Sequence, residues 1–181
     1  MKKIFAAISL FIILNSSSLF GQDVFGVGAF IGGGTIKGNS PAQGSYTASI
    51  FIETNMPFVN IALLRLSFLY AADFNSILPD SRVVYNSFVK GITLKMMLSQ
   101  LLENNFYLEE GMGLLLLNDR TFSDTDIMDA GLAASLLAGI DFRNNLEADG
   151  FRLGAGVEYG LTFTNTLASY ISFHLQGEYF F

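Results

Sequence analysis

Apolar and polar side chains alternate with a period of two residues through the C-terminal segment 169–181. One face of this segment carries Ile171, Phe173, Leu175, Gly177, Tyr179 and Phe181, and the other carries Tyr170, Ser172, His174, Gln176, Glu178 and Phe180. Because successive side chains of a β-strand point to opposite sides of the sheet, this alternation predicts a strand with one almost continuous apolar face.

The same alternation recurs upstream in the chain. In segment 127–142, Leu132 and Leu136 share one face, whereas Ser135 and Gly139 share the other. Helical spacing would scatter such residues around an axis instead of separating them. The chain is therefore predicted to be all-β. The expected strands, each with ends uncertain by two to four residues, are 23–33, 44–54, 58–71, 82–98, 105–117, 127–142, 150–163 and 169–181.

The composition narrows the fold further. Hydrophobic residues make up 51% of the chain and the mean hydropathy is +0.44, yet the chain has no apolar run long enough for a membrane-spanning helix. A membrane β-barrel accommodates this composition because its strands place apolar residues outward, against lipid, and polar residues inward. The predicted fold is an antiparallel, up-and-down, eight-stranded transmembrane β-barrel formed by residues 22–181.

The first residues have the three parts of an export signal: a basic start, an apolar run over 4–14 and a polar stretch over 15–18. The apolar run is shorter than the roughly twenty residues of a helix that spans a bilayer. Residues 1–21 are therefore predicted to be a cleavable signal peptide. Cleavage after Ser18 and cleavage after Gly21 both remain open.

Charge excludes one class of partner. Removal of Lys2 and Lys3 with the signal peptide lowers the number of basic residues from 10 to 8 against 16 acidic residues, so the formal net charge changes from −6 to −8. A chain this acidic has no electrostatic means of binding nucleic acid. The sequence contains no cysteine, so an exported protein of this kind is stabilised without disulfide bonds.

The connections between the expected strands alternate in length. Those after the second, fourth and sixth strands are short or rich in turn residues, and those after the first, third and fifth are longer. This rhythm is typical of periplasmic turns and outer-surface loops, although the last connection, 164–168, is also short. The short connections are 55–57, 99–104 and 143–149, and the longer ones are 34–43, 72–81 and 118–126.

Together, the signal peptide, the strand count, the segment Phe106–Gly113 and the terminal Glu178–Phe181 resemble the small eight-stranded outer-membrane barrels of the OmpA/OmpX type. The resemblance covers the whole mature chain. It implies a monomer in the outer membrane of a Gram-negative cell, in contact with lipid and lipopolysaccharide, without metal or cofactor. It also implies export through periplasmic chaperones and the barrel-assembly machinery, with Tyr179 and Phe181 as the C-terminal assembly signal. Unlike many such barrels, the chain has no Trp, so Tyr and Phe must form the interfacial girdles.

A barrel of eight strands has an interior just wide enough to be filled by side chains. The side chains expected to point inward are Glu53, Arg65, Lys95, Glu109, Asp141, Arg152, Glu158, His174, Gln176 and Glu178. Counting residues across the turns predicts the cross-strand pairs Lys95–Glu109, Asp141–Arg152 and Glu158–His174. Since buried charges are costly unless paired, we expect a polar plug that rigidifies the barrel.

These features favour a non-enzymatic barrel whose exposed loops serve envelope integrity, adhesion or surface binding. Two alternatives remain open: a narrow pore for small solutes, and a secreted, lipocalin-like barrel that binds a lipid. A lipid A-modifying enzyme is the least favoured alternative. It needs a nucleophile, a base and an acid, and Ser172, His174 and Glu158 are all expected to face the lumen, away from the acyl chains of a substrate.

Two further features of the sequence concern acidic residues. Asp119, Asp124 and Asp126 lie in one expected loop but lack the spacing of a calcium loop, so a solvated acidic loop is expected. Glu110 follows the inward Glu109 and is therefore expected to face lipid, unless a β-bulge resets the alternation there.

Overall fold

The structure is a computed structural model that describes residues 25–56, 59, 62–77, 85–102, 105–143 and 148–181. The predicted signal peptide, 1–21, lies outside the described residues. A short 3₁₀ helix, η1 (Phe74–Ser76), follows the third strand. The strands are β1 (Phe25–Lys37), β2 (Gln43–Asn55), β3 (Ala62–Asp73), β4 (Phe88–Leu101), β5 (Phe106–Arg120), β6 (Ile127–Asp141), β7 (Gly150–Thr162) and β8 (Ser169–Phe180).

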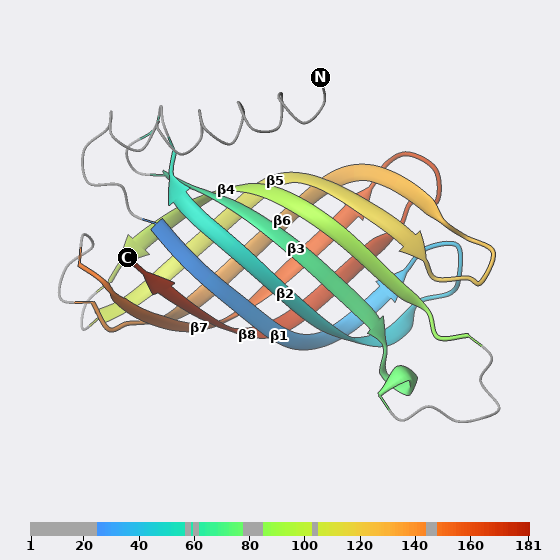
Figure 1. The fold of residues 1–181 in the computed structure, drawn as a ribbon, viewed down its shortest axis with the longest axis horizontal. Coiled ribbons are helices and arrows are strands. Elements are labelled where there is room, and N and C mark those ends of the chain that lie inside the picture. The colour runs from blue at the N-terminus through green and yellow to red at the C-terminus, as the bar shows by residue number, and fades with distance from the viewer. Residues whose placement is uncertain (1–24, 57–58, 60–61, 78–84, 103–104, 144–147) are drawn as a thin grey trace, which may run out of the picture.

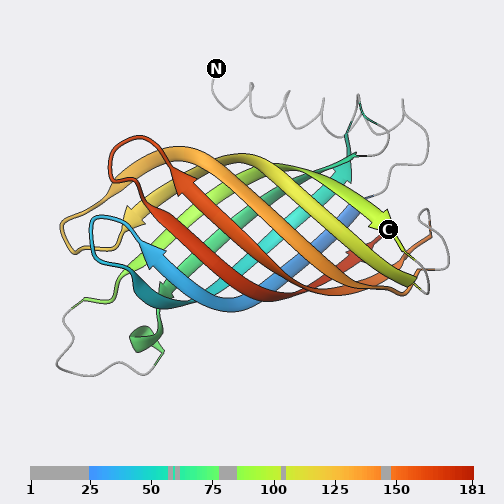
Figure 2. The ribbon, with the colours of Figure 1, turned by 180° about the vertical axis from the view of Figure 1, so that it is seen from behind.

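Each strand pairs antiparallel with its neighbours in sequence, and β8 pairs with β1, which closes the sheet. Figures 1 and 2 show the closed barrel from opposite sides, with its strands tilted against the long axis and with the C-terminus at the same end as the start of β1. The predicted all-β, antiparallel, up-and-down barrel of eight strands is confirmed. None of the helices in the described part of the chain is long and apolar enough to cross a membrane.

The predicted alternation of short and long connections is only partly correct. Gly34 pairs with Ser45 and Ile36 with Gln43, so the first connection shrinks to residues 38–42. Strand pairing continues there because it satisfies backbone amides that a loop would leave to solvent. The connections 121–126 and 163–168 are short as well, and the long one is 74–87.

The outer surface of the barrel is apolar, as the alternation predicts. Leu132 and Leu136 are 43% and 48% exposed, whereas the intervening Ala133 is buried and Ser135 faces the lumen with it. The same rule holds on β1, where the outward Ile31 is 68% exposed. A surface of this kind is stable against lipid rather than against water.

The interior also contains an apolar cluster, which sequence reasoning missed. It gathers mainly toward the loop end, where Ile36 and Leu117 lie near the ends of their strands. In the run Leu114–Leu117 both alternating faces are leucine, so a period of two residues does not reveal which face is inward. The cluster comprises Phe30, Ile36, Phe51, Leu69, Ala71, Val89, Leu115, Leu117, Ala133, Ala168 and Tyr170.

Candidate functional site: the filled barrel interior

Arg65 is the centre of an ion-pair network near the end of the barrel that holds the C-terminus. It lies directly opposite Glu53 on the adjacent strand, and its Nε lies 2.5 Å from a Glu53 carboxylate oxygen. Its guanidinium also lies 2.8 Å from Glu109 and 3.5 Å from Glu178. A second NH group donates to the Oε1 of Gln176 at 3.3 Å. One buried guanidinium thus connects strands β2, β3, β5 and β8.

Arg152 performs the same role from β7. Its guanidinium lies 3.0 Å from Glu109 and 3.7 Å from Asp141, the residue directly opposite it on β6. It also donates to the hydroxyl of Ser99 at 2.9 Å and stacks 3.8 Å over the ring of Tyr107. The predicted Asp141–Arg152 pair is therefore confirmed.

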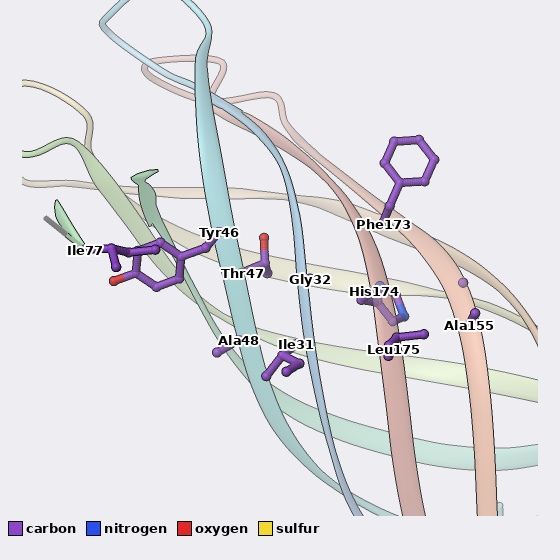
Figure 3. A pocket seen from close by; sticks show the side chains of 11 residues that line it. Ile31, Gly32, Tyr46, Thr47, Ala48, Ile77, Ala155, Phe173, His174 and Leu175 are labelled. Carbon is purple, nitrogen blue, oxygen red and sulfur yellow. The ribbon is translucent and has the colours of Figure 1, made fainter. Parts of the chain in front are cut away.

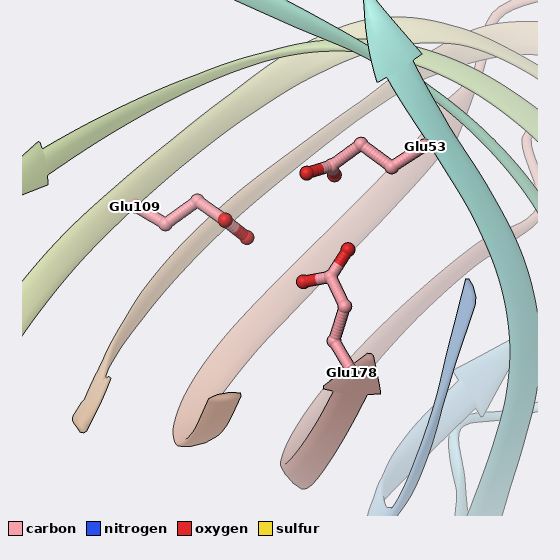
Figure 4. A group of neighbouring side chains, drawn as sticks. All are labelled: Glu53, Glu109 and Glu178. Atoms are coloured by element: carbon pink, nitrogen blue, oxygen red, sulfur yellow. The ribbon is translucent and has the colours of Figure 1, made fainter. Parts of the chain in front are cut away.

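Three buried carboxylates converge between these two arginines. Figure 4 shows Glu53, Glu109 and Glu178 reaching toward one another from three strands, and one oxygen of each lies within 4.8 Å of the others. Carboxylate oxygens in such a group can hold a metal ion. Here Arg65 and Arg152 already supply positive charge to these carboxylates, so we interpret the group as part of the ion-pair network.

The predicted pair Lys95–Glu109 is wrong. Lys95 lies opposite Gly113, four residues from Glu109 along β5, because the ladder between β4 and β5 continues to Leu101 and Tyr107. Lys95 instead crosses the lumen and forms its ion pair with Glu158 of β7.

The predicted pair Glu158–His174 is wrong as well. Glu158 lies opposite Ser172, and its second carboxylate oxygen accepts a hydrogen bond from the hydroxyl of Tyr170 at 2.6 Å. The imidazole of His174 stacks on Phe30, with 4.1 Å between the ring centroids. All the side chains predicted to point inward are buried, so the errors concern partners and not faces.

Loops from opposite sides of the ring are tied together at the other end. The backbone NH of Asn39, in the β1–β2 loop, donates to the carboxylate of Asp119 on β5 at 3.0 Å. The side chain of Asn39 donates to Thr125 at 3.1 Å, and the NH of Ser40 donates to Thr121 at 3.3 Å. Gly38 passes so close that an added Cβ would lie 2.3 Å from the Asp119 carboxylate. These contacts draw the β1–β2 loop across the mouth of the barrel.

Asp129 organises the last loop in a similar way. Its carboxylate accepts hydrogen bonds from the hydroxyl of Thr164 and the NH of Asn165, both at 2.6 Å, and from the NH of Thr166 at 3.1 Å. Sequence reasoning missed this residue, because a single Asp at the start of a strand has no distinguishing pattern.

The three aspartates of the predicted acidic loop have separate environments. Asp119 is buried and ties the loops, whereas the exposed Asp124 accepts a hydrogen bond from the neighbouring Ser123 at 3.4 Å. Asp126 forms an ion pair with Arg120 at 2.7 Å. A hydrogen bond from the Asn118 amide, together with Arg120, holds the pKa of Asp126 below its usual value.

Glu110 faces outward in a regular ladder. It lies opposite Leu98 on one side and Leu136 on the other, and the pairing runs through this position without an extra residue. The alternative of a β-bulge at Glu110 is therefore wrong, and its exposed side chain lies on the apolar outer surface.

A closed eight-stranded barrel with an apolar exterior and a filled interior is the fold of small outer-membrane β-barrels. The chain is similar to the crystal structure of Neisserial surface protein A (NspA), with a TM-score of 0.58 at 10% sequence identity, over 86% of this chain and 96% of that chain. It is also similar to Ail, the attachment invasion locus protein of Yersinia pestis, in complex with the heparin analogue sucrose octasulfate. There the TM-score is 0.55 at 12% identity, over 88% and 99% of the two chains. No family model and no curated protein sequence matches the chain.

Proposed function

We propose that the protein is a non-enzymatic, non-conducting barrel of the Gram-negative outer membrane that serves as a structural element of the envelope. The observation that carries this proposal is the filled interior. Arg65 and Arg152 join charged groups of several strands, and the Lys95–Glu158 pair crosses the lumen. The apolar cluster and the tied loops lie beyond them toward the mouth.

Aromatic side chains at both ends of the outer surface support the membrane location. At the end with the C-terminus, the ring of Phe181 lies 4.9 Å from that of Tyr179. At the loop end, the ring of Tyr70 lies 6.2 Å from Tyr46 and 5.7 Å from Phe88. Such rings form girdles at the two interfaces of a bilayer, with an apolar band between them.

A catalytic role has little support from the geometry. Ser172, His174 and Glu158 are buried inside the barrel. The imidazole of His174 stacks on Phe30, and Glu158 binds Lys95 and Tyr170 instead, whereas a base acts only within hydrogen-bond distance of its proton.

Exposed loops are the part of such a barrel that meets other molecules. Adhesion or surface binding is the second candidate, and segment 74–87, the longest connection, would carry it. The similar barrel Ail is an attachment invasion locus protein, and its crystal structure holds a heparin analogue.

Conductance tests the closed interior. Purified protein that shows heat-modifiable mobility on gels, the sign of a folded barrel, is added to planar lipid bilayers, with a large porin as the positive control. We expect no discrete current steps. Stable steps from the folded protein would instead support the narrow pore for small solutes.

Genetic complementation separates the two surface roles. A strain without the protein is expected to become sensitive to detergents, and the full chain is expected to restore resistance. A variant in which residues 75–86 are replaced by a short turn should restore resistance if the barrel acts as a scaffold. If that variant is present at normal abundance in the outer membrane but does not restore detergent resistance, the result would favour binding through the loop.

A further inference from the structure

The outer wall of the barrel contains an apolar furrow of about 720 Å³ across β2, β1, β8 and β7 (Figure 3). Small side chains, Ala48 and Ala155, line its two ends, and Ile31 and Leu175 lie between them in the same row across the sheet. Phe173 rises on one side, and Tyr46 with Ile77 rises on the other. The furrow lies near the middle of the wall, since Ile31 is the central residue of β1.

The flank formed by Ile77 follows directly after η1, which packs onto the barrel wall. Phe74 of η1 packs over two glycines: an added Cβ on Gly33 would lie 3.2 Å from its ring, and one on Gly44 would lie 3.5 Å away. Its ring also lies 6.4 Å from that of Tyr46. Because Gly33 and Gly44 carry no side chains, Phe74 packs directly against the wall there. The segment 74–77 therefore forms a raised side of the furrow that a plain sheet surface would lack.

The positively charged Lys37 lies on β1, six residues beyond Ile31 toward the loop end of the barrel. Lys37 ends β1 and points outward in the same row as Ile31, and its side chain is exposed. It forms no ion pair with any residue that the structure describes. Six residues of extended strand span about 20 Å, and strand tilt shortens this along the membrane normal. An acyl chain that lies in the furrow would therefore place its headgroup near Lys37.

We propose that this furrow binds an acyl chain of a phosphorylated glycolipid of the outer leaflet, with Lys37 contacting a phosphate of its headgroup. The proposal rests on the membrane location under Proposed function. Charge selects the occupant, because the exposed Lys37 at the level of the headgroups complements a phosphate. The apolar walls complement the hydrocarbon.

Retention of lipid A by the folded, detergent-purified protein tests the proposal by native mass spectrometry. The variant A48F/A155F fills the furrow, and A130F/A134F makes the same changes at outward positions of β6. We expect the furrow variant to lose bound lipid A by about tenfold, the effect of about 1.4 kcal/mol, and the β6 variant to retain it. Equal retention by the two folded variants would overturn the proposal.

The headgroup contact is tested with Lys37→Glu and with a second lipid. We expect K37E to lower lipid A retention, and phosphatidylglycerol to be retained less than lipid A by the original protein. Retention unaffected by K37E, or equal retention of the two lipids, would contradict the assignment to a phosphorylated glycolipid.

A spectroscopic measurement covers the case in which the double variant fails to fold. Because the chain contains no Trp, F173W introduces a single probe beside the furrow and L116W introduces one on the opposite wall. In phosphatidylcholine vesicles with a small fraction of lipid A brominated on its acyl chains, we expect stronger quenching of F173W. Equal quenching overturns the furrow alone, whereas failure of both folded variants to enter vesicles contradicts the membrane location.

Discussion

Buried charge is tolerated near the centre of this network because the guanidinium groups of Arg65 and Arg152 each meet more than one carboxylate. Arg152 contacts Glu109 and Asp141 while its face rests on Tyr107. Removing one member of such a network leaves the others buried and uncompensated, which costs more than the pair contributes. The charged residues of the interior are therefore expected to respond far more strongly to substitution than those of the rim.

Arg152→Ala should lower the free energy of unfolding by about 3–5 kcal/mol, because it strips Glu109 of a buried partner. Arg120→Ala is the matched control: its ion pair with Asp126 lies at the exposed rim, where such pairs contribute little. Urea unfolding in detergent micelles, followed by circular dichroism, compares the two. Similar losses for both variants would contradict the buried network.

A double-mutant cycle distinguishes the ion pair observed in the lumen, Lys95–Glu158, from the predicted pair Glu158–His174. Lys95→Met and Glu158→Gln should each destabilise the barrel, and together cost less than the sum of the two, because the double variant leaves no unpaired charge. Glu158→Gln combined with His174→Gln should be nearly additive. Urea midpoints of the single and double variants provide the coupling energies, and a larger coupling for Glu158 with His174 would be inconsistent with the structure.

On β6, the expected cost of an outward charged residue depends on which residues lie opposite it, as well as on the face that it occupies. Leu132 and Leu136 both point outward, and by alternation alone Arg should be equally costly at either position. Leu132 lies between Leu114 and Leu161, whereas Leu136 lies beside the outward carboxylate of Glu110. Directly opposed residues of opposite charge stabilise a sheet.

We therefore expect Leu132→Arg to cost up to about 2–4 kcal/mol in a bilayer, the range for Arg near the midplane. Leu136→Arg should cost less, because its guanidinium pairs with Glu110. Folding equilibria in lipid vesicles measure the cost of both substitutions. Comparing Leu136→Arg alone, Glu110→Gln alone and the two together isolates the contribution of the pair between the new Arg and Glu110. If Glu110→Gln leaves the penalty at position 136 unchanged, the neighbouring carboxylate is irrelevant there.

The molecule as a whole depends on the seam between β8 and β1. Twelve positions pair across it, from Gly26 with Phe180 to Lys37 with Ser169. Beyond the strand, the NH of Phe181 donates to the carbonyl of Phe25 at 2.9 Å, and the two rings lie 6.2 Å apart. In lipid, an open seam would leave a row of unpaired amides, each costly.

Phe181→Asp and deletion of 179–181 should both block assembly, because they weaken the seam and remove the aromatic terminus expected to serve as the assembly signal. The measurement is the amount of heat-modifiable barrel in the outer-membrane fraction. Phe173→Asp is an outward control on the same strand. Refolding of purified Phe181→Asp in detergent distinguishes the two causes: normal refolding with failed assembly in cells points to the signal, and normal yield in cells contradicts the prediction.

Much of this architecture follows from local pattern. The alternation on segments such as 127–142 determines which side chains meet lipid and which meet the lumen, because adjacent residues of a strand must point to opposite sides. The number of strands and the inward placement of Glu109, Glu158 and His174 follow from it directly. The apolar cluster does not, since in Leu114–Leu117 both faces are equally apolar.

Partners across the sheet and across the lumen depend on register and closure. A slip of two or four residues leaves every side chain on its original face, so alternation does not distinguish between such registers. The predicted partners of Lys95 and Glu158 were wrong by such even slips, four residues on β5 and two on β8. Three features join segments far apart in the chain: the Lys95–Glu158 pair, the hydrogen bond between Asn39 and Asp119, and the furrow flanked by Ile77. They exist because the eight strands close, and a closed ring brings together residues that no local pattern connects.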